Sequence, residues 1–166
     1  MRTWIMWAAL ALQAACVPPA TMTPPARGGG SARVASAPAA PANDAQAVHA
    51  AVNRHRQSRG CAPLVWSEGA ARAAQRHSED MVRRRFFSHT SPEGTQPWDR
   101  MRAQGLSFTR AAENIAMNGG GAQATVRGWI NSPGHRANIE NCALTHTGVG
   151  VAASYWTQVF FTASGG

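Results

Sequence analysis

The end of the chain decides the fold, because residues 148–162 have the sequence GVGVAASYWTQVFFT. The valine-rich run at 148–152 and the aromatic run at 156–162 are typical of two β-strands. The three residues between these runs can connect the strands as a hairpin. This stretch therefore predicts an antiparallel pair of strands.

Helical patterns occupy the chain before this hairpin. Four helices are expected, and capping residues, prolines and glycines mark their limits. The first runs from Asn43 or Asp44 to Gly60, the second begins after Ser67, the third runs from Pro97 to Gly105, and the fourth follows Gly119–Gly121. The apolar residues 63–66 form an extended connection between the first two helices. Helices early and strands late predict the α+β class, in which helices pack on a small antiparallel sheet.

The first 42 residues differ in composition from the rest of the chain. Arg2 precedes the run Trp4–Ala15, which carries no charge and is typical of an export signal ending at Cys16. That run is too short to cross a bilayer as a transmembrane helix. Residues 17–42 are rich in proline, alanine and glycine, so we expect a disordered linker. The sequence thus predicts a signal peptide at 1–16, a linker at 17–42 and one folded domain at 43–166.

One of the three cysteines lies at the end of the predicted export signal, and the other two lie in the predicted domain. Cys16 follows the apolar run directly, so it is either lipid-modified after signal cleavage or removed with the signal. Cys61 and Cys142 are an even pair, for which a disulfide is the default in an oxidising compartment. That bond would close a loop of about 80 residues. Two buried free thiols are the alternative.

The formal net charge of +8 comes from arginine alone, which suits an acidic partner. The arginines are scattered, however, and they are not interleaved with aromatic residues. Together with the export signal, this argues against nucleic acid as a partner. The one run, Arg83–Arg85, is best interpreted as a solvated helix face. We expect a monomer that touches a membrane only through a lipid anchor on Cys16.

Three residues in segments of unusual composition are the candidate site. His89, Glu113 and His135 lie 24 and 22 residues apart. Two imidazoles and a carboxylate can bind a divalent cation or exchange protons. No H-E-x-x-H helix presets two ligands, however. The structural alternative is that Glu113 accepts hydrogen bonds that hold loops together, with His89 and His135 in those loops. His77 has no partner at ligand spacing, so we interpret it as a partly buried packing residue.

Nucleophilic catalysis is not supported by the sequence. Cys142 with His135 and Asn138 is similar to a thiol protease in residue type, but a disulfide sulfur cannot attack. Ser88 and Ser91 flank His89, yet no G-x-S-x-G motif exists in the chain.

Seven segments, in order and at plausible spacing, resemble one known family. They are Asn53-Arg54-His55-Arg56, Pro63-Leu64, Ser88-His89, Glu113-Asn114-Ile115-Ala116, Gly134-His135-Arg136-Ala137-Asn138-Ile139, Gly148-Val149-Gly150 and Trp156-Thr157-Gln158-Val159-Phe160. Together they resemble the CAP superfamily, named for cysteine-rich secretory proteins, antigen five and pathogenesis-related proteins, and in particular its compact bacterial branch. The likeness covers residues 43–162, nearly all of the expected SCP domain.

The resemblance implies an α/β/α sandwich with a central antiparallel sheet, flanked by helices. It also implies a cleft that many relatives line with two histidines and two glutamates. His89 matches the first histidine, Glu113 one glutamate and His135 the second histidine. The position of the other glutamate is Ser132 in this chain.

From these features we expect an extracytoplasmic protein that is secreted, periplasmic or lipid-anchored at the cell envelope. The leading hypothesis is a non-enzymatic module whose cleft recognises an envelope, lipid or host ligand. His89, Glu113 and His135 would weakly bind a divalent cation such as zinc. The alternative is a metal-assisted hydrolase that acts on peptides or cell-wall polymers.

Overall fold

The structure is a computed structural model, and it describes residues 42–165. The predicted signal peptide, the lipidation site at Cys16 and nearly all of the predicted linker lie outside the described residues. The first helix begins at Ala42, one residue before the expected start of the domain. Within the described part of the chain, no helix is both long and apolar enough to cross a membrane.

Five helices and four strands make up residues 42–165. In chain order they are α1 (Ala42–Ser58), β1 (Val65–Trp66), α2 (Glu68–Arg84), α3 (Pro97–Arg102), β2 (Phe108–Met117), α4 (Gly121–Asn131), α5 (Pro133–Ile139), β3 (His146–Ala152) and β4 (Tyr155–Ala163). The predicted α+β class is confirmed. Each of the four predicted helices is present, and the two predicted strands are β3 and β4.

The strands form one sheet in the order β1-β3-β4-β2. The predicted hairpin pairs β3 with β4, and β2 extends the sheet antiparallel to β4. The two residues of β1 pair parallel to β3, so the sheet is mixed and not wholly antiparallel. Strand β2 is missing from the predicted elements because it contains Glu113 and Asn114, whose residue types are depleted in strands.

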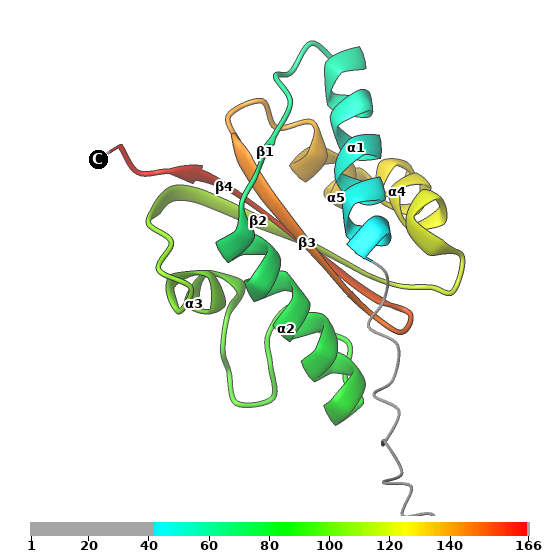
Figure 1. Cartoon of the computed structure of the whole chain (residues 1–166), viewed down its shortest axis with the longest axis vertical. Helices are drawn as coiled ribbons and strands as arrows, with labels where there is room; N and C mark the ends of the chain where they lie inside the picture. Colours follow the sequence, from blue (N-terminus) through cyan, green and yellow to red (C-terminus); the bar gives the residue numbers. More distant parts are fainter. Residues whose placement is uncertain (1–41, 166) are drawn as a thin grey trace, which may run out of the picture. The chain divides into compact units, whose positions relative to one another are not determined.

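Helices cover both faces of this sheet, α1, α4 and α5 on one and α2 and α3 on the other (Figure 1). The alternation along β4 explains the two layers, because successive side chains of a strand point to opposite faces. Trp156 and Phe160 pack with α1, α4 and α5, whereas Val159 and Phe161 pack with α2 and α3. The molecule therefore has two apolar cores separated by one sheet.

Two glycines in β3 let helix α2 lie directly on the sheet. A Cβ atom added to Gly150 would lie 2.1 Å from the backbone nitrogen of Gln75, and one added to Gly148 would lie 2.0 Å from that of Ala71. Both contacts are with helix backbone, which cannot rotate away as a side chain could. This close approach explains why the strand carries the pattern Gly-Val-Gly.

Replacing Gly150 with alanine should therefore force α2 off the sheet and lower the free energy of unfolding by about 3 kcal/mol or more. Gly128, on the exposed side of α4, has nothing within 4 Å of its added Cβ and is the matched control. Gly128→Ala should be neutral or stabilise the protein by up to about 1 kcal/mol. Urea unfolding of both variants measures the difference, and equal stabilities would contradict the close-contact interpretation.

Helix α1 is tied to the segment that carries α5 by one buried arginine. The Arg56 side chain donates to the carbonyl oxygens of Ala62, Ile139, Asn141 and Leu144 at 2.7–3.0 Å. Only 1% of the residue is exposed, and burial lowers the pKa of its guanidinium from the usual value. Arg56 thus joins α1 to the last residue of α5 and to the segment that follows it.

The predicted disulfide between Cys61 and Cys142 is confirmed and lies beside this arginine. The two Cα atoms are 5.0 Å apart, and the cysteines are separated by 81 residues in sequence. A bridge across so long a loop restricts the unfolded chain strongly.

Removing the bridge with the double substitution Cys61→Ala and Cys142→Ala should lower the free energy of unfolding by about 4 kcal/mol. Chemical denaturation of the oxidised protein and of the double variant gives this difference. Adding a reductant should destabilise the parent protein by a similar amount and leave the variant unchanged. A reductant effect on the variant would show that something other than the bridge is responsible.

Candidate functional site

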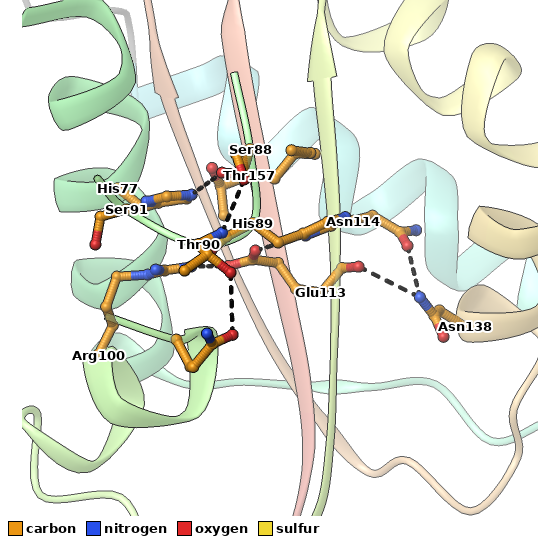
Figure 2. Close-up of polar contacts among 12 residues, drawn as sticks. His77, Ser88, His89, Thr90, Ser91, Arg100, Glu113, Asn114, Asn138 and Thr157 are labelled. Carbon is orange, nitrogen blue, oxygen red and sulfur yellow. Dashed lines mark hydrogen bonds and ion pairs between the residues drawn. The ribbon is translucent and has the colours of Figure 1, made fainter. Parts of the chain in front are cut away.

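The candidate site is built around a buried carboxylate on β2. The side chain of Glu113 is only 2% exposed. Its Oε1 lies 2.8 Å from Nδ1 of His89, and its Oε2 accepts a hydrogen bond of 2.8 Å from Nη2 of Arg100 (Figure 2). Both carboxylate oxygens are therefore engaged by groups that favour negative charge.

Arg100, on α3, also fixes the loop that carries His89. Its guanidinium donates to the carbonyl oxygens of His89 at 2.9 Å and of Thr95 at 3.1 Å. The imidazole of His89 is held by Glu113 through Nδ1, and about half of the side chain (49%) is exposed. Its Nε2 has no hydrogen-bond partner in the described part of the chain and is available to a ligand.

His135 lies on helix α5 and not in a loop, which corrects the sequence-based expectation. Pro133 occupies the first turn of that helix, where proline is favoured because the missing N–H would be unpaired anyway. The buried side chain of Asn114 donates to the carbonyl oxygen of His135 at 3.1 Å. Asn138 in turn donates to Asn114 at 2.9 Å and to the carbonyl oxygen of Glu113 at 3.3 Å. These amides dock α5 on β2 and so place His135 near Glu113.

His135 lies close enough to His89 for the charge of one to act on the other. Burial lowers the pKa of His135, and the nearby charge of His89 lowers it further. Ser132, in the position where many relatives are expected to carry glutamate, places its Oγ 3.0 Å from Nδ1 of His135. Each histidine therefore has its Nδ1 occupied and its Nε2 free of protein partners within residues 42–165.

The structure thus brings His89, Glu113, His135 and Ser132 to one region of the protein. Within residues 42–165, however, no three or more His, Cys, Asp or Glu side chains are grouped closely enough to hold a metal ion. Direct ligation of a cation by Glu113 stays a prediction, since its oxygens already bind His89 and Arg100.

An apolar groove of about 380 Å³ begins at His135. Its lining comes from β2, α4 and the residues around them: Phe87, Ile115, Ala116, Met117, Asn118, Ala124, Thr125, Gly128, Trp129, Ser132 and His135. Phe87 and Met117 are large, apolar and about half exposed, at 47% and 55%. The polar groups in the lining mostly bind one another, because Asn118 donates to Thr125 and Trp129 donates to the carbonyl of Ile115. His135 and Ser132 are therefore the polar end of an otherwise apolar groove.

Sequence reasoning misses Arg100 and the role of Asn114. Arg100 sits among scattered arginines, and only the folded loop shows that it pairs with a carboxylate 13 residues away. His77, which we expected to be partly buried, is buried at 1% exposure, and its ring lies 5.9 Å from that of Phe86.

A sheet between two helical layers is the fold that this chain shares with solved SCP domains. The model of the CAP family, described as the cysteine-rich secretory protein family, matches residues 49–163. The chain therefore belongs to the CAP family.

Two relatives from Bacillus subtilis (strain 168) are similar in sequence. The uncharacterised protein YkwD is 41% identical over 110 residues, which cover 65% of this chain and 43% of that protein. The uncharacterised membrane protein YlbC is 43% identical over 105 residues, which cover 63% of this chain and 30% of that protein. This chain matches less than half the length of each of these relatives.

Solved structures show the same fold. An extracellular protein with an SCP domain from Bacillus anthracis has a TM-score of 0.70 and 35% identity, over 72% of this chain and 40% of that one. An outer surface protein from Borrelia burgdorferi has a TM-score of 0.68 and 20% identity, over 74% of this chain and 95% of that one. The second likeness concerns the fold alone.

Replacing Arg100 with methionine should leave the buried carboxylate of Glu113 with His89 as its only partner. We expect a loss of about 3 kcal/mol in the free energy of unfolding at neutral pH. The control is Arg102→Met on the same helix, because the Arg102 side chain is 63% exposed and its one ion pair within residues 42–165, with Asp99, is 3.5 Å long. That change should cost less than about 1 kcal/mol. Denaturant melts of the two variants compare them directly, and a mild effect at Arg100 would argue against a structural ion pair.

Proposed function

We propose that this protein is an exported CAP-domain binding module that acts outside the cytoplasm and is not an enzyme. One observation carries the proposal: the single carboxylate at the cleft, that of Glu113, is 2% exposed and held on both oxygens by His89 and Arg100. A carboxylate in this state anchors other side chains. It is poorly placed to take a proton from water or substrate.

The two histidines are suited to a divalent cation of low affinity. Both leave Nε2 without a hydrogen-bond partner among residues 42–165, and Glu113 holds the far nitrogen of His89, an arrangement that orients ligating histidines in metal proteins. Two protein ligands are fewer than the three or four usual for zinc, however. The positive charge of Arg100 beside Glu113 opposes a second cation as well. We therefore expect weak zinc binding through His89 and His135.

The groove beside His135 supports an apolar ligand with one polar end. An extended peptide would need backbone partners, but the outward carbonyls of Glu113 and Ile115 on β2 already accept from Asn138 and Trp129. A lipid needs no such partners, and the exposed Phe87 and Met117 offer it apolar contact. Among the envelope, lipid and host ligands considered, a lipid fits these walls best. The extracellular relative from Bacillus anthracis supports a place outside the cytoplasm.

A metal-assisted hydrolase is the second candidate function. The observation in its favour is that His89 and His135 each leave Nε2 without a partner among residues 42–165, and that His135 lines an open groove that could hold a substrate. A bound zinc ion would supply an activated water in such a site. Hydrolysis would also need a general base to take up a proton from that water. Glu113 is not free for this role, because its two oxygens already bind His89 and Arg100.

Calorimetric titration with zinc tests both functions. We expect a dissociation constant in the micromolar range or weaker, which is lost in His89→Ala and in His135→Ala because each removes one of two ligands. His146→Ala is the control, since His146 stacks on Phe161 at another part of the sheet, and it should bind zinc like the parent protein. Hydrolysis of generic peptide and ester substrates should remain at background with zinc present. Binding tighter than micromolar that depends on both histidines and switches on hydrolysis would overturn the binding-module proposal.

A further inference from the structure

The apolar groove has an exposed edge made of large side chains. Phe87 and Met117 line the groove and are nevertheless 47% and 55% exposed. Tyr155 joins them, because its ring lies 6.2 Å from that of Phe87 and it pairs with Met117 across β4 and β2. The end of α2, which precedes Phe87, and the β3–β4 turn lie at the same end of the molecule (Figure 1). We call Phe87, Met117 and Tyr155 the apolar rim.

The apolar rim differs from the other exposed apolar side chains of the domain. Val65, Val82 and Trp98 are also exposed, but none of them lines the groove. Single apolar residues on a surface are ordinary, whereas a group of them beside a hollow is typical of an interaction site. The rim is therefore a candidate contact surface.

The charges beside the groove have one sign. The two stretches that line it, 85–92 and 114–135, contain no aspartate or glutamate. Arg127 is exposed on α4, three residues after Ala124 in the lining, and residues at this spacing are neighbours on a helix surface. Arg85 is exposed at the start of the first stretch. Neither guanidinium forms an ion pair or a hydrogen bond within the described part of the chain. The surroundings of the rim thus favour a negatively charged partner.

An anionic bilayer offers the two chemistries that this surface requires. Aromatic and other apolar side chains enter the boundary between head groups and acyl chains, where tyrosine keeps its hydroxyl hydrated. Arginines beside them are attracted to negative head groups. A bilayer also presents lipid directly at the mouth of the groove, so that lipid would not have to cross water to enter it.

We propose that the apolar rim inserts into the surface of a bilayer that contains anionic lipid, with Arg85 and Arg127 on its head groups. This docking goes beyond the proposed binding of a lipid inside the groove, because the rim touches the bilayer whether or not the groove is filled. It also adds a contact of the folded domain to the predicted anchor at Cys16.

Sedimentation with vesicles tests the docking. The purified full chain carries Cys16→Ser in every sample, so that no lipid on this cysteine can hold it to a membrane. Vesicles with about one third phosphatidylglycerol in phosphatidylcholine should bind the protein at least about tenfold more tightly than pure phosphatidylcholine vesicles, because two free arginines meet opposite charges. Salt at about 1 M should remove most of this difference.

Matched variants identify the surface that binds. The double substitution Phe87→Ser and Met117→Ser should weaken binding to the anionic vesicles at least about tenfold. Val65→Ser is the control, since Val65 is 58% exposed on β1, at the opposite edge of the sheet from β2. Arg127→Gln should weaken binding about fivefold. Arg76→Gln, an exposed arginine on α2 in the other helical layer, should change it little. Thermal unfolding confirms that each variant is folded.

Three results would overturn the proposal. One is equal binding to the two kinds of vesicle, and another is unchanged binding in the double variant. The third is a dimer that the double variant separates in size-exclusion chromatography while no vesicle is bound, because a second copy then covers the rim. Binding of monomeric lysophosphatidylcholine is measured separately. A protein that binds this lipid and no vesicle would retain the proposed lipid function of the groove and lose the docking.

Discussion

The cleft depends on burying one negative charge within a strand. A carboxylate that is 2% exposed would be very unfavourable without partners, and Glu113 has two, Arg100 and His89. Those partners come from α3 and from the loop before it, so a single ion pair fixes three segments at once. The imidazole of His89 inherits its orientation from this arrangement. The ion pair between Glu113 and Arg100 therefore positions the side chains at the cleft and is not itself a reactive group.

The opposite wall of the cleft is set by neutral amides. Asn114 is fully buried on β2, and it binds both the backbone of His135 and the side chain of Asn138. Two adjacent residues of β2 thus bind the two sides of the cleft. The carboxylate of Glu113 binds Arg100, and the amide of Asn114 binds the backbone of His135. The hydrogen bonds from Asn114 and Asn138 therefore make the positions of the segments around 113 and 135 depend on each other. Neither could be placed correctly without the other.

The elements whose stability is local could be predicted from the sequence, while those that depend on a distant partner could not. The hairpin at 148–162 shows strand composition within itself, and Ser67 and Pro97 mark helix starts by their own chemistry. The two residues of β1 form a strand only because β3 lies beside them. Likewise, nothing near Arg100 in sequence reveals its pairing with Glu113. Helix α5 is missed because Pro133-Gly134 favours a turn as readily as a helix start.

The position of α5 next to the disulfide ties the cleft to the redox state of its surroundings. Cys142 follows this helix by three residues, and Arg56 binds the carbonyls of Ile139 and Asn141 in the same stretch. The helix that presents His135 is thus held at its far end by a buried cation on α1 and by a covalent bond to the residues just after α1. Under reducing conditions the covalent tie is lost, while the hydrogen bonds of Arg56 and the ion pairs of Glu140 with His55 and Arg59 remain. Oxidation of the two cysteines therefore adds a covalent tie to the wall that carries His135.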